Sequence, residues 1–345
     1  MKINKVLFVG LGGAGQRHLR MFKAHLPGGV AFTAYRATGQ TPALNNDFTV
    51  AEGVSLADEY GLSLFDNLDA ALDDGPDLVV ISNPTALHLG VMQKAAARGI
   101  GIFVEKPATH TLDGLDELEA LVREKDLPFF VSFQRRFHPH LHRIKEMMET
   151  GALGKTLNAG FSVASYVPAW HPYEDFRQLY ACRKDLGGGV LLTEIHEIDL
   201  CCWYFGPPQT VACTGGNYSD VAMDVEDTVH LTLGYTEFSV RIDLCFMQRH
   251  NQRRLFIAGT DGYVEWDQDG NRLLVEDYKS GQNESLEDPC FANDDMFTAQ
   301  TRYFVDEFEP QGSGDYLDAA RQSLVVVEAA RQSMVSGTAV PLYKF

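Results

Sequence analysis

Three glycines near the start of the chain have a spacing that suits phosphate binding. Gly10, Gly12 and Gly15 form the pattern G-x-G-x-x-G, directly after the apolar run of residues 5–9. Glycines at this spacing permit a tight turn, the approach of a pyrophosphate to the backbone, and close packing of a helix on a strand. The free N–H groups of that helix would face the phosphates. The pattern predicts a dinucleotide site if a strand precedes it and a helix follows it.

The surrounding residues supply that context. Short apolar runs predict strands over residues 5–10, 30–36, 76–84, 100–107 and 127–134, and helical patterns lie between them, over 13–26, 56–62, 69–75, 87–99 and 112–126. Such alternation is typical of a parallel sheet with helices on both faces. We therefore expect an α/β Rossmann domain over residues 1–128 that binds a dinucleotide. A glycine-rich turn without a ligand is the alternative interpretation.

The pattern changes after about Gly151. Alternating apolar and polar residues predict antiparallel strands, and two longer segments predict helices. The strands are expected over 156–167, 227–246 and 253–266, and the helices over 187–206 and 316–337. Residues 129–345 are thus predicted to form an α+β domain with a large, mostly antiparallel, open sheet.

Arg36 bears on the choice of cofactor. It stands at the end of the second predicted strand, where an acidic residue would bind the ribose 2′-hydroxyl of NAD, and Thr38 and Thr41 follow it. A guanidinium and hydroxyls suit a 2′-phosphate instead. We expect NADP to be preferred, with NAD remaining an alternative if Arg36 points into solvent.

Composition limits the class of protein. A chain of 345 residues favours two domains, and its formal charge of −18 argues against nucleic acid or an anionic membrane as partner. It has no run of eighteen apolar residues and no signal-peptide pattern. The six cysteines lack C-x-x-C spacing, which is typical of free thiols in a reducing compartment. A cytoplasmic protein is expected.

Four segments resemble a known family. "GLGGAGQRH", "SNPTALH", "VEKPA" and "GGGVLLTEIHEID", in this order and spacing, resemble the Gfo/Idh/MocA oxidoreductases, and the resemblance extends over nearly the whole chain. It implies an NAD(P)-dependent oxidoreductase that acts on a hydroxyl or keto carbon of a sugar, sugar acid or cyclitol. It also implies a homodimer or homotetramer formed through the open sheet of the second domain. Two alternatives stay open: an NAD-using glycoside hydrolase of the same family, and a non-catalytic cofactor or sugar sensor.

The resemblance also implies the cofactor contacts. They are Gly10, Gly12, Gly13, Ala14 and Gly15 in the turn, Asn83, Pro84 and His88 after the fourth strand, and Glu105 and Lys106 after the fifth. Together with Arg36 and Thr38 they complete the predicted cofactor site.

Lys106, His196 and Thr193 are the catalytic residues that the resemblance implies. Lys106 would hydrogen-bond the reacting hydroxyl and stabilise negative charge. His196 would move the proton, since imidazole titrates near neutral pH. Thr193 stands where relatives commonly have an aspartate one turn before the histidine, with Glu194 beside it. Which group orients His196 is therefore left open.

A polar, aromatic-rich series between the two domains has the chemistry of a sugar pocket. Its members are Arg135, Arg136, Tyr166, Trp170, His171, Arg177, Tyr180, Arg183 and Lys184. Aromatic rings stack on sugars, and arginine binds carboxylate or phosphate bidentately. We expect Arg135, Tyr166, Trp170, Arg183 and His196 to bind an acidic or phosphorylated sugar, a nucleotide sugar included. The alternative is that several of the cations pair with Glu174 and Asp185.

Two histidine patterns could suggest a metal. "HEID" lacks the second histidine of a zinc-protease motif, because Leu200 stands in its place. "HPHLH", residues 138–142, lacks cysteine or paired carboxylate partners and is interpreted as a solvated, partly capping stretch at the start of a helix. No metal is expected.

Overall fold

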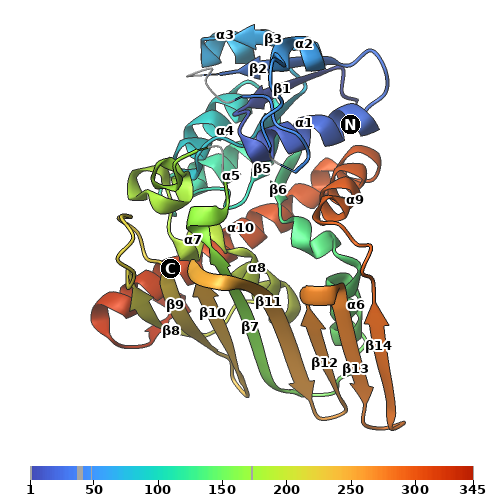
Figure 1. Ribbon diagram of the computed structural model, residues 1–345, viewed down its shortest axis with the longest axis vertical. Helices are drawn as coiled ribbons and strands as arrows, with labels where there is room; N and C mark the ends of the chain where they lie inside the picture. The colour runs from blue at the N-terminus through green and yellow to red at the C-terminus, as the bar shows by residue number, and fades with distance from the viewer. Residues whose placement is uncertain (1, 37–41, 48, 172–173, 345) are drawn as a thin grey trace.

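The computed structural model describes residues 2–36, 42–47, 49–171 and 174–344. Two sheets stand one above the other in Figure 1, with the chain beginning in the upper one and ending beside the lower one. No helix in the described ranges is long and apolar enough to cross a membrane.

The first sheet is wholly parallel and has the strand order β3-β2-β1-β4-β5-β6. Its strands are β1 (Lys5–Val9), β2 (Ala31–Tyr35), β3 (Ser63–Phe65), β4 (Leu78–Ile81), β5 (Gly101–Glu105) and β6 (Phe129–Ser132). The helices between them are α1 (Gly13–His25), α2 (Leu56–Tyr60), α3 (Leu68–Asp73), α4 (His88–Ala97) and α5 (Leu115–Glu124). The strand order reverses between β1 and β4, which is where such sheets bind ligands. The predicted Rossmann architecture is confirmed.

The second sheet has nine strands in the order β14-β13-β12-β11-β7-β10-β9-β8-β15. They are β7 (Thr156–Tyr166), β8 (Thr210–Gly216), β9 (Thr228–Gly234), β10 (Ser239–Cys245), β11 (Met247–Gly259), β12 (Gly262–Asp267), β13 (Arg272–Asp277), β14 (Gln282–Glu287) and β15 (Val340–Pro341). Only the pairing of β7 with β10 is parallel among those described. The predicted, mostly antiparallel sheet is confirmed.

The two faces of this sheet differ in chemistry. Val229, Leu231 and Leu233 on β9 are at most 1% exposed, because the side chains of their face pack into the core with the helices. Their neighbours His230 and Thr232 are exposed on the other face, where His230 lies 2.7 Å from Asp243 of β10. The alternation expected from the sequence is present, and contact between subunits through the open face stays a prediction.

After β14 the chain returns to the first domain, before its last strand, β15, pairs with β8 of the second sheet. Helix α9 (Asn293–Asp306), which the sequence analysis did not predict, packs on α1, and helix α10 (Ser313–Ser336) packs on β6 as well as on β8. Both helices lie between or beside the two sheets in Figure 1. Strand β6 pairs with β5, so the first sheet extends to Ser132, past the boundary expected at residue 128. The two-domain division itself stays a prediction.

Candidate active site

The glycine turn between β1 and α1 has the shape expected of a phosphate cradle. Gly10 has a φ of +95°, and a Cβ there would lie 2.5 Å from the backbone nitrogen of Asn83. A Cβ on Gly15 would collide with the carbonyl oxygen of Gly10, so the helix can approach the strand only with glycine here. A Cβ on Gly12 would meet nothing within 4 Å, which leaves open space at the first residue before α1. These three positions fit a dinucleotide pyrophosphate.

The segment after β2 is held beside this turn by Gln16, which the sequence analysis did not single out. The fully buried Gln16 amide donates to the carbonyl oxygens of Leu11 (3.0 Å) and Pro42 (2.8 Å), and its oxygen accepts from the Leu44 N–H (2.8 Å). Arg36 stands at the end of β2, where partial burial lowers the pKa of its guanidinium. Thr38 and Thr41 lie outside the described residues.

His88 joins the loops that follow β4 and β5. Its Nδ1 lies 3.0 Å from the carbonyl oxygen of Pro107 and its Nε2 lies 2.8 Å from that of Asn83. The ring is 1% exposed, and burial is the main reason that its pKa lies below the usual value. The ring thus lies between two backbone carbonyls and its single N–H donates to one of them, so His88 ties these loops together. Its direct contact with a cofactor stays a prediction, as do those of Asn83 and Pro84.

Glu105 is the centre of a buried hydrogen-bond network. Its Oε1 lies 2.6 Å from His18 Nε2 and accepts from Ser132 Oγ (3.2 Å), and its Oε2 accepts from the Lys106 N–H (3.0 Å). Gln300 of α9 donates in turn to Ser132 Oγ (3.0 Å). Burial opposes ionisation of Glu105, but His18 and Lys106 outweigh it and lower the pKa of the carboxyl. The Glu105 carboxylate therefore holds the backbone N–H of Lys106. Side chains from α1, β6 and α9 hold that carboxylate in place.

Lys106 reaches across to the second domain. Its Nζ donates to the carbonyl oxygen of Thr193 at 2.6 Å, although the two residues are 87 positions apart. The structure therefore brings two of the predicted catalytic residues into contact.

The expected continuous helix over 187–206 is wrong, and its interruption explains this contact. Helix α7 (Val190–Thr193) ends where Glu194 has a ψ of +33°, and helix α8 begins at His196 and ends at Phe205. In an unbroken helix the Thr193 carbonyl would accept from the N–H of Glu197. That N–H instead lies 3.4 Å from the Glu194 oxygen, so the Thr193 carbonyl is available to Lys106.

The three glycines before α7 allow the chain to pack tightly around this break. A Cβ on Gly188 would collide with the carbonyl oxygen of Tyr180, and Gly189 has a φ of +103° with Glu226 against it. Gly187, with a φ of +78°, lies where a Cβ would be 2.9 Å from the Cβ of His110 in the first domain. This run therefore lets the start of α7 lie against both the Tyr180 turn and the dinucleotide domain.

His196 is 3% exposed and has no hydrogen-bond partner for its Nδ1 among the described residues. Burial above all, and then the charges of Lys106, Arg135 and Arg253, lower its pKa well below the usual value. The nearby carboxylates bind arginines: Glu194 lies 2.5 Å and Glu197 lies 3.3 Å from Arg253. His196 is thus held neutral, and no carboxylate in the described chain bonds it.

Arg253 was not predicted as a site residue. It lies on β11, which pairs with β7, so only the folded sheet brings it to α8. Asp199 of α8 accepts two hydrogen bonds, of 2.6 and 2.9 Å, from Arg136 in the 3₁₀ turn after β6. No local pattern in the sequence signals these pairs.

The predicted substrate residues fall into two groups. Arg135 is 9% exposed, its side chain forms no hydrogen bond to the described residues, and its charge lowers the pKa of His196. The others have protein partners: Arg183 binds Asp185 (2.6 Å), Tyr166 Oη accepts from Arg249 (3.2 Å), and the Trp170 ring packs edge-on against Phe246 at 5.2 Å. The alternative of pairing with Asp185 therefore holds for Arg183. Their contact with a substrate stays a prediction.

The histidines of residues 138–142 take part in local structure. His138 Nδ1 accepts from the His140 N–H and caps helix α6 (Pro139–Glu149). It is 2% exposed, so the expected solvation is wrong for this residue, and burial lowers its pKa to about 3. In the described ranges no group of three or more His, Cys, Asp or Glu residues could hold a metal ion.

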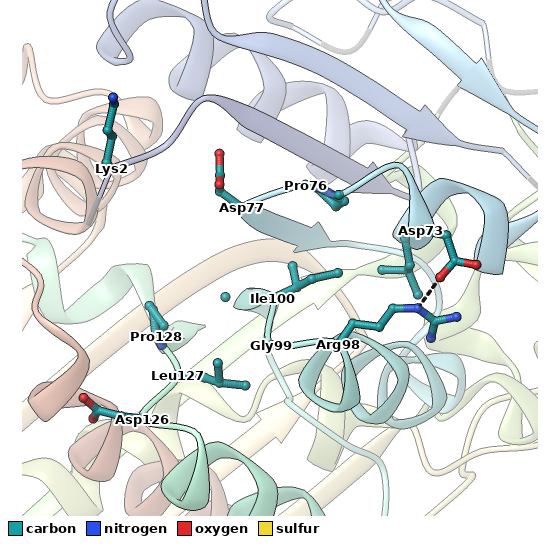
Figure 2. A pocket seen from close by; sticks show the side chains of 13 residues that line it. Lys2, Asp73, Pro76, Asp77, Arg98, Gly99, Ile100, Asp126, Leu127 and Pro128 are labelled. Carbon is teal, nitrogen blue, oxygen red and sulfur yellow. Dashed lines mark hydrogen bonds and ion pairs between the residues drawn. The ribbon is translucent and has the colours of Figure 1, made fainter.

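A cavity of about 610 Å³ lies at the opposite edge of the first sheet (Figure 2). It is lined by residues just before β4, β5 and β6, among them Asp77, Ile100 and Pro128. The Arg98–Asp73 pair, 2.7 Å apart, closes one side. Parallel sheets bind ligands at the carboxyl ends of strands, so this cavity is separate from the site around Lys106.

Both parts of the chain match models of one protein family. An oxidoreductase family with an NAD-binding Rossmann fold, Gfo/Idh/MocA, matches residues 4–133, and the C-terminal domain of the same family matches residues 141–265. An uncharacterised oxidoreductase of Bacillus subtilis, YrbE, is 34% identical over 196 residues, which are 55% of each chain. The scyllo-inositol 2-dehydrogenase (NAD⁺) of the same organism is 28% identical over 67% of this chain and 62% of its own length. The chain thus spans less than two thirds of the length of either relative.

Among solved structures, levoglucosan dehydrogenase in complex with NADH and L-sorbose has a TM-score of 0.82. It is 19% identical, and the match covers 99% of both chains, so it supports the fold. With both domains of one family matched in order, and the glycine turn, the Glu105–Lys106 loop and the His196 helix in place, the chain belongs to the Gfo/Idh/MocA oxidoreductase family.

Proposed function

We propose that the protein is an NAD(P)-dependent oxidoreductase that acts on a hydroxyl or keto carbon of a sugar, sugar acid or cyclitol. The supporting observation is a group of buried polar atoms without hydrogen-bond partners among the described residues, on Thr193, which contacts Lys106, and on residues at or near His196. They are Arg135 Nε, Thr193 Oγ1, His196 Nδ1 and Glu197 Oε2. Unsatisfied buried groups are rare in folded proteins and gather where a ligand completes them. A polyhydroxylated substrate supplies both donors and acceptors.

The cofactor would lie along the glycine turn. Gly10, Gly12, Gly13, Ala14 and Gly15 would hold the pyrophosphate, and Arg36 with Thr38 would favour the 2′-phosphate of NADP over NAD. The open space at Gly12 fits this role. When bound, the nicotinamide supplies the hydride acceptor or donor.

His196 and Lys106 have different roles at the substrate hydroxyl. As an alcohol is oxidised, its carbon loses a hydride, its oxygen loses a proton, and a carbonyl forms. The neutral imidazole of His196 accepts that proton, and the Lys106 ammonium stabilises the charge that develops on the oxygen. Thr193 holds Lys106 Nζ through its carbonyl and offers its own hydroxyl to the substrate.

The relatives favour this class of substrate. One is named for scyllo-inositol and NAD⁺, and a structural neighbour for levoglucosan and NADH. The same proposal includes a cytoplasmic location and a homodimer or homotetramer built on the open sheet.

Steady-state kinetics on a substrate found by screening sugars, sugar acids and cyclitols tests the assignment. His196→Asn should reduce kcat by about 10²–10⁴-fold, the usual range for general acid–base catalysis, without weakening cofactor binding. Lys106→Ala should cause similar damage, and the double variant little more, because both groups act on one step. Near-normal kcat in His196→Asn would move the proton transfer to another residue.

The same assay separates the alternatives. A glycoside hydrolase of this family would release sugar with no net NAD(P)H formed, and a sensor would bind without turnover. Net reduction of the cofactor in proportion to substrate would exclude both.

A further inference from the structure

Arg135 differs from Arg136 and Arg253 in that no carboxylate of the described residues bonds its side chain. Glu194 and Glu197 both bind Arg253, and Asp199 binds Arg136 through both of its oxygens. The Arg135 side chain makes no hydrogen bond to the described residues, although the charges of Glu194 and Glu197 act on it. A buried guanidinium is costly unless its N–H groups are hydrogen-bonded, so this side chain has donors that a ligand would satisfy.

Arg135 is buried at a defined position in the fold. The residue lies in a 3₁₀ turn (Gln134–Phe137) directly after β6, at the carboxyl edge of the first sheet, and only 9% of its surface is exposed. Its Nε is shut off from solvent, whereas its two Nη atoms are not among the buried atoms that lack partners. The tip of the fork is therefore the part that is open to a ligand.

Arg135 lies near His196 in the fold. Phe133, two residues before Arg135, packs against the His196 ring at 6.4 Å between centroids, and the charge of Arg135 acts on that imidazole. Arg135 is therefore a neighbour of the imidazole that the proposed function places at the substrate.

We propose that Arg135 binds a carboxylate of the substrate, which makes a sugar acid the preferred class. This inference rests on the proposed oxidoreductase function. A guanidinium binds a planar carboxylate through two parallel hydrogen bonds. A phosphate monoester carries nearly two negative charges at neutral pH, which Glu194 and Glu197 beside Arg135 disfavour.

The test compares neutral sugars with their own acids on the wild-type protein. D-glucose with D-glucuronate, and D-galactose with D-galacturonate, differ only at the terminal carbon. Binding is measured by calorimetry with NADH present, and turnover by cofactor reduction. At least one acid should bind about tenfold or more tightly than its neutral partner, as expected for charge-assisted hydrogen bonds. Glucose 6-phosphate should bind more weakly than the acid.

Variants assign the effect to Arg135. Arg135→Gln should remove the preference for the acid and leave NADH binding unchanged, and Arg135→Lys should retain part of the preference. Arg143→Gln serves as the matched control, because Arg143 lies eight residues further on, exposed, and pairs with Glu284. The control should keep the full preference.

The outcomes separate this inference from the proposed function. Equal binding of neutral sugar and acid, with cofactor reduction still observed, would overturn the carboxylate site alone. Tighter binding of the phosphate, or an unchanged acid preference in a folded Arg135→Gln, would do the same. Failure of every sugar, acid and cyclitol to reduce the cofactor would overturn the proposed function as well.

Discussion

Replacement of Glu105 by glutamine removes one charge from the most connected carboxylate of the site while keeping its shape. In the wild type, Oε1 meets His18 Nε2 at 2.6 Å and Ser132 Oγ at 3.2 Å, and Oε2 meets the Lys106 N–H at 3.0 Å. A glutamine amide has one oxygen, and its NH₂ group would face a donor. At least one buried donor would lose its acceptor.

The expected cost follows from burial. Hydrogen bonds to charged groups contribute about 1.5–3 kcal/mol each. Because the Glu105 side chain is 12% exposed and that of His18 is 0% exposed, water does not replace a bond that is lost. We expect Glu105→Gln to lower the free energy of unfolding by about 1.5–3 kcal/mol for the donor that loses its acceptor, measured by urea denaturation at pH 7.

The pH dependence has a defined sign. The folded-state pKa of Glu105 is lowered from 4.5, so its stabilisation is fully present above the unfolded value and is lost as pH falls through the folded value. The difference between wild type and variant should therefore be constant above about pH 5 and shrink in more acidic solution. Asp69→Asn, in an exposed cluster with Lys94 and Arg98, is the control and should change stability little. Equal stability of Glu105→Gln and wild type at pH 7 would refute the reasoning.

Four further outcomes are expected. Arg36→Ala should weaken NADP binding more than NAD binding, by about 1.5–3 kcal/mol if a charged hydrogen bond is lost; equal losses in calorimetry would remove Arg36 from that role. Because the pKa of His196 is lowered in the ligand-free protein, kcat/KM for alcohol oxidation should stay constant as pH falls through 6.5 and decline only in more acidic solution; a pH profile of kcat/KM that falls at or above 6.5 would contradict this. Gln300→Leu should lower the free energy of unfolding by about 1–3 kcal/mol, since Ser132 loses a buried donor, and urea denaturation would detect it. The open sheet face, where Phe256 and Tyr263 stack 6.2 Å apart, should be covered by a second subunit; a monomer at micromolar concentration in sedimentation would exclude this.

The sequence by itself determined the features that depend on short-range patterns. Apolar runs alternating with helical patterns indicate the parallel sheet, because a strand buried on both faces must be apolar throughout. Gly10 and Gly15 indicate the phosphate turn, since no Cβ fits at either position. The alternation of Val229 to Leu233 indicates a sheet with one buried face, because side chains on a strand point alternately to its two faces.

Only the tertiary structure decided which side chains meet. The break at Glu194 leaves the Thr193 carbonyl to Lys106, which is 87 positions away, and a window of helical residues carries no sign of it. Likewise, the sequence analysis did not predict helix α9 (Asn293–Asp306), which packs on α1 from the far end of the chain.

The charges of the site show the same division. The sequence places Arg135, Arg183 and Arg253 in the chain but gives no means of pairing them, since ion pairs form between residues that are distant in sequence. In the fold, Arg183 pairs with Asp185 and Arg253 pairs with Glu194 and Glu197. Of the three arginines, Arg135 alone has no carboxylate bound to it among the described residues. The sequence determined which charged residues the chain contains. The long-range contacts decided which of them are paired within the protein and which remain to bind a ligand.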